Sequence, residues 1–227
     1  MVGTQTQPQL ISLDFPEALA SLELFPGVWK AAEMLGSLDV KMRHHAMDEL
    51  LRTDAPRISP LIAYLVATRL LDSDLSLRTR IVEALANVMR RDADGRYAPD
   101  AVRSHVISAL AYFGDPGILA LLDLAIKDSS LIPHINKLLN FSPKAGDCLK
   151  NVAGDREKTI EFRRMAIFFI GKIGYVDAAS ELKRIRNRIE TRQEAQKRMP
   201  FAPPAAEDSE KELLQEIQKT LAVLRQE

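Results

Sequence analysis

The chain has 227 residues, of which 46% are hydrophobic and 27% are charged, a composition typical of a protein that buries its own core. The 31 Lys and Arg residues equal the 31 Asp and Glu residues, and this zero net charge argues against a protein dedicated to nucleic acid. The single cysteine, Cys148, excludes an intrachain disulfide and a cysteine-based metal cluster.

The N-terminal segment lacks the features of an exported or membrane protein. Residues 1–13 are polar, so we expect a flexible tail there. They contain no basic stretch followed by an apolar one, as a signal peptide requires. The longest apolar run, MAIFFIG at 165–171, is far shorter than the roughly 18 residues of a membrane span. We therefore expect a cytoplasmic protein without a membrane-spanning helix.

Helical periodicity runs through the rest of the chain. Asp14 and Pro26 each mark the start of a short helix, the second ending at Gly36. From Asp39 onward, apolar residues recur at spacings of three and four, and Asp, Pro and Gly interrupt the pattern. The sequence thus predicts an all-α domain over residues 14–198. Its helices are expected over 39–53, 57–71, 76–91, 99–113, 117–128, 131–141, 144–152, 156–173 and 176–198.

A separate amphipathic helix is predicted at the C-terminus, over 209–226 within a last segment of 209–227. A Pro/Ala linker, MPFAPPAAED at 199–208, precedes it, and Ser209 with Glu212 has the spacing of a capping box. One face of the helix is apolar, so it must pack on something. This face either caps the domain or forms a homodimer, and it carries Leu214, Ile217, Leu221 and Leu224.

Four arginines begin the same pattern of apolar residues: Arg43, Arg78, Arg103 and Arg163. Apolar side chains follow each arginine at offsets of three, four and seven, which places them on one side of a helix. Gly114 and Gly174 stand at offset eleven after the last two arginines, where a glycine can end a helix in a left-handed conformation. Asp115-Pro116 then begins the next helix, so the pattern predicts a helical pair joined at a tight turn.

This pattern resembles a HEAT repeat, the helical hairpin of α-solenoids. The resemblance is carried by VRSHVISALAYFGDPGILALL at 102–122 and FRRMAIFFIGKIGYVDAASEL at 162–182. It implies an α-α superhelix of stacked antiparallel hairpins, closed by a C-terminal capping helix. Family repeats often carry an Asp just before the Arg, and their side chains can join successive repeats in a polar ladder. Asp39, Asp74 and Asp100 stand at such positions, although exposed pairs within one helix are the alternative.

The sequence offers no catalytic constellation. It lacks the phosphate-binding, dinucleotide-binding, nucleophile-elbow and HExxH motifs. His44 with Asp48, and His45 with Glu49, have i,i+4 spacing, but further metal ligands are missing. We therefore expect no cofactor, no metal and no enzymatic activity.

The basic segment 181–198, ELKRIRNRIETRQEAQKR, is the strongest candidate for a binding surface. Arg184, Arg188 and Arg192 are spaced four apart and share one helical face. We predict that these three arginines bind a partner, together with Tyr64. A solvated face, or docking of the acidic C-terminal segment onto this helix, are the alternatives.

Three functions remain open from sequence. The first is a non-enzymatic scaffold or adaptor that binds another protein through a long helical surface. The second is an accessory subunit of an enzyme, such as the HEAT-like proteins that resemble phycobilin lyase subunits; only the repeat itself supports it. The third is binding of nucleic acid or an anionic surface by residues 181–198, which the zero net charge disfavours.

Overall fold

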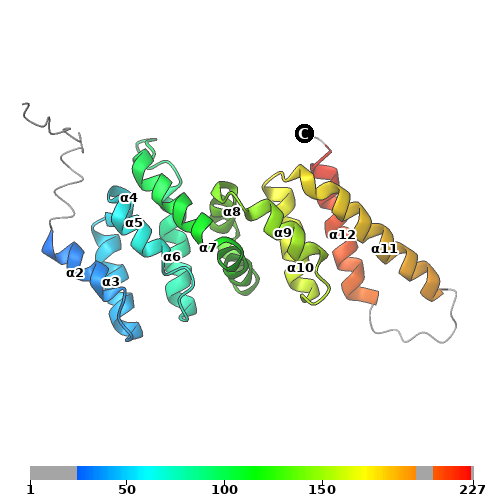
Figure 1. The fold of residues 1–227 in the computed structure, drawn as a ribbon, viewed down its shortest axis with the longest axis horizontal. Coiled ribbons are helices and arrows are strands. Elements are labelled where there is room, and N and C mark those ends of the chain that lie inside the picture. The colour runs from blue at the N-terminus through cyan, green and yellow to red at the C-terminus, as the bar shows by residue number, and fades with distance from the viewer. Residues whose placement is uncertain (1–24, 198–206, 226–227) are drawn as a thin grey trace, which may run out of the picture.

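The computed structural model describes residues 25–197 and 207–225, and all regular elements in these ranges are helical (Figure 1). The all-α prediction is confirmed. The predicted tail over 1–13, the short helix after Asp14 and most of the linker over 199–208 lie outside the described residues. The helices are α2 (Pro26–Met34), α3 (Val40–Arg52), α4 (Ala55–Ile58), α5 (Pro60–Ala67), α6 (Leu75–Val88), α7 (Asp100–Lys127), α8 (Ile132–Phe141), α9 (Ala145–Gly154), α10 (Ile160–Lys172), α11 (Ala179–Lys197) and α12 (Glu207–Val223).

These helices follow one another along the long axis of an elongated molecule, from α2 at one end to α11 and α12 at the other (Figure 1). Each helix packs mainly on helices that are near in the chain: α2 on α3, α5 on α7, α9 on α10 and α10 on α12. Two short 3-10 turns, Ser129–Leu131 and Val176–Ala178, precede α8 and α11. The result is a row of helices in which each part of the core is shared by neighbours.

Polar side chains cap the first turns of several helices. The side chains of Asp39, Asp74 and Thr159 accept hydrogen bonds from backbone N–H groups in the first turns of α3, α6 and α10. Each cap satisfies a donor that has no partner within its helix. The helix starts at these positions are therefore set by local sequence.

The helix predicted over 57–71 is wrong as a single helix, because the chain breaks at Ser59 and Pro60. Ser59 has an extended backbone (φ −101°, ψ 122°), and its hydroxyl accepts a hydrogen bond from Ile62 N at 3.2 Å. Proline has no amide hydrogen for the helical bond to the carbonyl four residues earlier. α4 therefore ends at Ile58, and α5 starts anew at Pro60.

α7 contains the GDPG break inside one long helical element. Gly114 has φ 52° and ψ −133°, so it separates two helical stretches, as the sequence predicts. This backbone is open to glycine, but its ψ is not that of the left-handed helical cap we expected.

α7 is also long and apolar enough to cross a membrane, by length and composition only. Uninterrupted apolar runs, on which the expectation from sequence rested, do not reveal this helix. Half of the most apolar window of α7 is buried inside the protein, so this feature is weak support for a membrane span.

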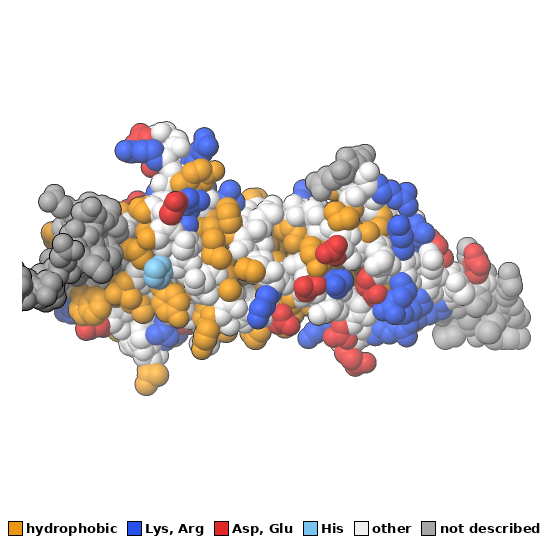
Figure 2. Space-filling view, turned by 45° about the horizontal axis from the view of Figure 1, so that its top comes forward, with side chains coloured by type: hydrophobic (Ala, Val, Ile, Leu, Met, Phe, Trp, Pro, Cys, Tyr) orange, Lys and Arg blue, Asp and Glu red, His pale blue; other side chains and the backbone are white. Residues whose placement is uncertain are grey.

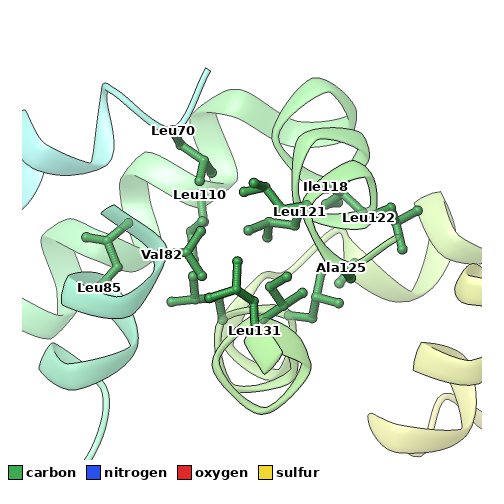
Figure 3. Close-up of a cluster of buried hydrophobic side chains, with 14 of the residues drawn as sticks. Leu70, Val82, Leu85, Leu110, Ile118, Leu121, Leu122, Ala125 and Leu131 are labelled. Carbon is green, nitrogen blue, oxygen red and sulfur yellow. The ribbon is translucent and has the colours of Figure 1, made fainter. Parts of the chain in front are cut away.

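The two stretches of α7 fold around one apolar cluster (Figure 3). Leu110 precedes the break at Gly114, and Ile118 follows it, yet both point into the same core. Residues after α5, from α6 and from the turn before α8 complete the cluster. Each of its labelled members is at most 4% exposed: Leu70, Val82, Leu85, Leu110, Ile118, Leu121, Leu122, Ala125 and Leu131.

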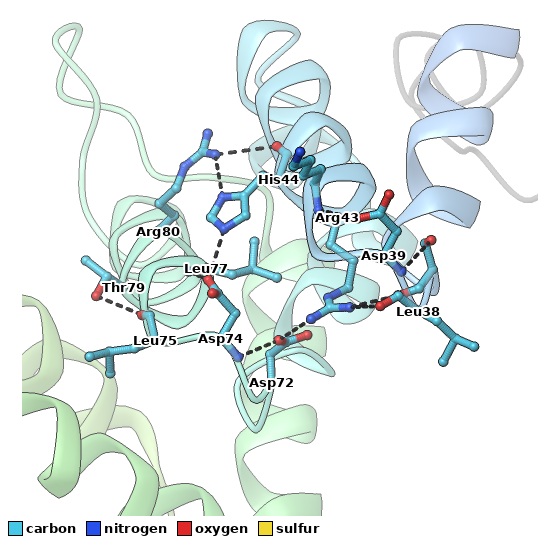
Figure 4. A network of polar contacts seen from close by, with 12 residues as sticks. Leu38, Asp39, Arg43, His44, Asp72, Asp74, Leu75, Leu77, Thr79 and Arg80 are labelled. Carbon is cyan, nitrogen blue, oxygen red and sulfur yellow. Dashed lines mark hydrogen bonds and ion pairs between the residues drawn. The ribbon is translucent and has the colours of Figure 1, made fainter.

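The first anchor arginine, Arg43, connects the start of α3 with the chain just before α6 (Figure 4). Its guanidinium donates to Asp72 at 2.9 Å and to the carbonyls of Ser37 and Leu38 at 2.9 and 3.1 Å. The side chains of Arg43 and Asp72 are only 8% and 5% exposed. Asp39, the carboxylate that the sequence suggested as a partner, instead accepts from Lys41 N.

Further polar contacts join successive helices. Nε2 of His44 on α3 lies 2.9 Å from Asp74, which therefore pairs across to α3 rather than with Arg78 (Figure 4). Arg78 on α6 donates to Ala120 O at 2.7 Å and lies 3.4 Å from Asp123 on α7. These contacts form a ladder across neighbouring helices, but its partners differ from the Asp–Arg pairs that the spacing suggested.

The two remaining anchor arginines make local contacts. Arg103 pairs with the exposed Asp100 in the same helix and donates to Ala98 O at 3.2 Å. Arg163 donates from Nε to Ala153 O at 3.0 Å, which joins the end of α9 to α10. For Asp100 and Arg103 the structure thus shows the pair within one helix, the alternative to a ladder.

Gly174, the second glycine at offset eleven of the pattern, lies just after the end of α10 and has φ 66°. The next amide, Tyr175 N, donates to Ile170 O at 3.1 Å, as in a Schellman cap. A side chain at Gly174 would be strained in this conformation. This helix end is therefore the left-handed glycine cap that the sequence predicts.

α12 runs back along α11 and packs on α10 and α11 (Figure 1). Its first residue is Glu207, so Ser209 is not the N-cap that the sequence predicted. Thr220 donates to Ile167 O at 3.1 Å and lies close to Gly171 on α10. The apolar face of α12, predicted either to cap the domain or to form a homodimer, is covered by the rest of the same chain. Leu214 is only partly buried, whereas Leu213, Ile217, Leu221 and Leu224 are buried.

Candidate functional site

The two ends of the row have different surfaces. Among the side chains that the structure describes, eleven of the thirteen exposed large hydrophobic ones lie between Phe25 and Tyr112, and the other two are Val176 and Val223. In Figure 2 hydrophobic side chains are spread over the N-terminal end, whereas Lys and Arg side chains gather towards the C-terminal end. The charge that is balanced over the whole chain is therefore not balanced locally.

A cleft of about 220 Å³ lies within this C-terminal region, between the start of α10, the middle of α11 and the start of α12. We call it the basic cleft, because five of its lining side chains are cationic and one is a carboxylate. Its lining consists of Arg156, Lys158, Ile160, Arg163, Ile185, Arg188, Ile189, Arg192, Glu210 and Leu213.

Local structure explains how these cations meet. Arg188 and Arg192 are one turn apart on α11, and Ile185 and Ile189 hold that helix against the core. Arg163 lies in the first turn of α10, whose N-terminus carries the positive end of the helix dipole. Arg156 and Lys158 come from the loop before α10. Three separate segments thus bring positive charge to one place.

The charges of the basic cleft are poorly compensated by the protein. Arg192 lies 2.6 Å from Glu210, and Arg163 donates only to the carbonyl of Ala153. Among the described residues, Arg156, Lys158 and Arg188 have no ion pair or hydrogen-bond partner. Burial lowers the pKa of the Arg163 guanidinium, and repulsion from Arg156 lowers this pKa further, while Glu210 and Asp155 oppose the shift. An anion in the cleft would relieve this repulsion.

The structure divides the four predicted partner-binding residues among three places. Arg188 and Arg192 line the basic cleft. Arg184 lines a neighbouring hollow with Lys150 and pairs with Glu181 at 2.7 Å. Tyr64 lies on α5 in the other half of the row and is partly buried against the core. These residues therefore do not form one continuous binding site.

Sequence reasoning missed two residues of the cleft and assigned a third to another role. Arg156 and Lys158 fall in a short loop, and Arg163 was interpreted only as a structural anchor. The signal that could have found them is the run REK at 156–158 immediately before the helix cap Thr159. Basic residues placed just before a helix N-terminus combine side-chain and dipole charge.

The nucleophilic and metal-ligating side chains show no comparable arrangement. Cys148 is 3% exposed, and burial together with Asp115 raises the pKa of its thiol to about 12. The thiol is therefore protonated at neutral pH and is a poor nucleophile. His44 lies between Asp74 and Arg80. Within residues 25–197 and 207–225, no group of three His, Cys, Asp or Glu side chains could hold a metal ion.

Comparisons with known proteins add little to this description. No family model matches the sequence, and no curated protein matches it. Among solved structures, the chain is similar to a crystal structure of an engineered protein, with 16% sequence identity and a TM-score of 0.42. The likeness covers 88% of this chain and 80% of the engineered chain, and at this TM-score it identifies neither a fold family nor a function.

Proposed function

We propose that the protein is a HEAT-like α-solenoid that serves as a non-enzymatic scaffold or adaptor and binds another protein. The order of the helices along one axis, the glycine cap at Gly174 and the contacts of Arg43 and Arg78 to following helices support this assignment. α12, which covers the apolar faces of α10 and α11, is its capping helix.

The observation that carries the proposal is the uncompensated charge of the basic cleft. The chain as a whole has equal numbers of cationic and anionic side chains, yet five cations and one carboxylate line this cleft. Arginines that are held on rigid helices contribute strongly to protein interfaces, because their planar groups bind carboxylates with little loss of entropy. We infer that an acidic segment of the partner binds at this cleft.

Binding of nucleic acid or of an anionic surface is the second candidate. The specific observation in its favour is that Arg188 and Arg192 on α11 meet Arg156, Lys158 and Arg163 at one cleft. Such binding rests on phosphate neutralisation and weakens steeply with salt. The zero net charge of the chain places it second.

Affinity purification with the full chain from its native host tests the proposal. The variant combines Arg188→Gln with Arg192→Gln, and the matched control combines Arg52→Gln with Arg96→Gln, two exposed arginines outside the cleft. We expect the wild type and the control to recover the same protein partner and the cleft variant to lose it. Equal recovery by all three chains would contradict the site, and recovery that nuclease abolishes would favour the second candidate.

A further inference from the structure

We infer that the basic cleft recognises a phosphate monoester, carried by a phosphorylated side chain of the protein partner. This inference rests on the proposed function and specifies the ligand of its site. It follows from the amount of charge, the size of the cleft and the way in which its donors are held.

The first argument is the amount of charge. Among the described lining residues, five cations minus one carboxylate leave four positive charges, which Asp155 near Arg163 offsets in part. An aspartate or glutamate side chain supplies one negative charge, whereas a phosphate monoester carries about −1.5 to −2 at pH 7. One phosphate group therefore neutralises more of this charge in the same space, and it has three oxygens that accept from donors on different segments.

The second argument is size and lining. A volume of about 220 Å³ admits one side-chain-sized group. The apolar part of the lining is aliphatic, with Ile160, Ile185, Ile189 and Leu213, and the described lining contains no aromatic side chain. Proteins that bind single-stranded nucleic acid stack bases on aromatic side chains, which this cleft does not offer. The aliphatic lining also lowers the local dielectric and so strengthens charge-assisted hydrogen bonds.

The third argument is that two of the donors, Arg163 and Arg192, are already held in position. Arg163 uses Nε to donate to Ala153 O, which leaves the terminal nitrogens of its guanidinium for a ligand. Arg192 is held by Glu210, and Arg188 projects from the same packed helix. Donors that are fixed before binding lose little entropy on binding. The ligand would complete the hydrogen bonding of Arg163 and give Arg188 its ionic partner.

Titration of the full-length protein with N-acetyl-O-phosphoserine methylamide, followed by calorimetry and NMR, tests the inference. We expect saturable 1:1 binding, weakened about tenfold or more in Arg188→Gln because a charge-assisted contact is lost. The control Arg186→Gln, on the same helix but outside the lining of the cleft, should bind like the wild type. Binding should weaken as the pH falls below about 6, where the phosphate gains a proton. Thermal melts of both variants verify that they fold.

Four results would overturn the inference. The first is that the wild type shows no saturable binding, and the second is that Arg188→Gln binds as tightly as the wild type. The third is that N-acetyl-glutamate methylamide binds as tightly as the phosphoserine probe. The fourth is that inorganic phosphate or phosphatidic acid vesicles bind more tightly than the phosphoserine probe. Equal binding of the glutamate probe would leave the proposed function intact, because an acidic segment would still bind. If the wild type binds the phosphoserine probe normally but recovers no protein partner in the purification, the proposed function alone is contradicted.

Discussion

Arg43 and Arg163 occupy the same place in the repeated sequence pattern, at opposite ends of the row, but their surroundings differ. Arg43 is buried, paired with Asp72 and bonded to two carbonyls. Arg163 donates to one carbonyl and interacts electrostatically with the cations Arg156 and Arg188 as well as with Glu210 and Asp155, but it forms no close ion pair with a described residue. The comparison teaches that one sequence pattern can build a structural contact in one half of a protein and a candidate binding site in the other.

The same contrast extends to neighbouring arginines. In the N-terminal half, Arg57, Arg78 and Arg80 each meet a carboxylate from another part of the chain. In the C-terminal half, Arg188 has none among the described residues, and Arg184 and Arg192 stand one turn away on either side of it. These three cations of the first half therefore join separate segments, whereas in the described lining of the basic cleft only Arg192 has such a carboxylate, Glu210.

Asp72→Ala tests the contribution of the buried Arg43–Asp72 pair to stability, and we expect it to have a larger effect than any of the other substitutions. This variant leaves the Arg43 guanidinium buried without its carboxylate, which should lower the free energy of unfolding by about 3–5 kcal/mol. Urea denaturation measures the change. The matched control is Asp94→Ala, which removes an exposed pair with Arg96 and should change stability little. Similar values for the two variants would show that Arg43 does not hold the N-terminal half together.

A second test concerns the turn between the two stretches of α7. Gly114→Ala should destabilise the protein by about 1–3 kcal/mol, because its positive φ strains a residue with a side chain. A methyl group at this position meets nothing closer than 3.7 Å, so the cost comes from the backbone. Gly27→Ala on α2, where the added methyl group contacts nothing, is the control and should be neutral or slightly stabilising. A neutral Gly114→Ala variant would mean that the turn tolerates another conformation.

A third test compares one arginine from each half. Arg80→Gln loses contact with Asp48 and should reduce stability by up to about 1 kcal/mol. Arg188→Gln removes repulsion with Arg184 and Arg192 and should increase stability by about 0.2–0.5 kcal/mol at low salt. Thermal melts at low and high salt measure both changes, which should shrink as salt rises. If both variants shift stability in the same direction, the proposed difference between the halves is wrong.

The smallest expected effect is the pH dependence of the contact between α3 and α6. The Leu77 amide and His44 lower the pKa of Asp74 below its ordinary value of 3.8. A lowered pKa in the folded state stabilises the protein above the unfolded-state value, and this contribution disappears as the pH falls through the folded value. Asp74→Asn should therefore show a flatter loss of stability below pH 3.8 than the wild type. Parallel denaturation curves would contradict this role for Asp74.

Much of the fold could be predicted from local sequence. The spacing of apolar residues located most of the helices, although the caps Asp74 and Thr159 were recognised only in the structure. The break at Gly114 and the cap at Gly174 followed from glycines that tolerate positive φ. These features depend on residues within a turn or two of one another, which is why a single sequence predicts them. The split at Ser59 was missed because the apolar pattern continues across Pro60.

The candidate site was predictable only in part. Arg188 and Arg192 stood out because they lie in one basic segment, but Arg163 comes from another helix and Arg156 from a loop. Tyr64 was selected as an aromatic residue on a helix, and its partial burial against the core depends on neighbours that the local pattern does not specify. The convergence of three segments on one cleft is not encoded in the spacing of any one of them.

By itself, the sequence determined the helical class, most helix ends and the position of each anchor arginine within its helix, because backbone propensity and periodicity act over a few residues. Only the tertiary structure decided that Arg43 pairs with Asp72, 29 residues away, and that Arg163 forms no close ion pair within the described part of the chain and lies near Arg156 and Arg188. The physical reason is that hydrogen bonds and close ion pairs act over a few ångströms. Whether a charge is paired depends on which segments come together once the helices have packed.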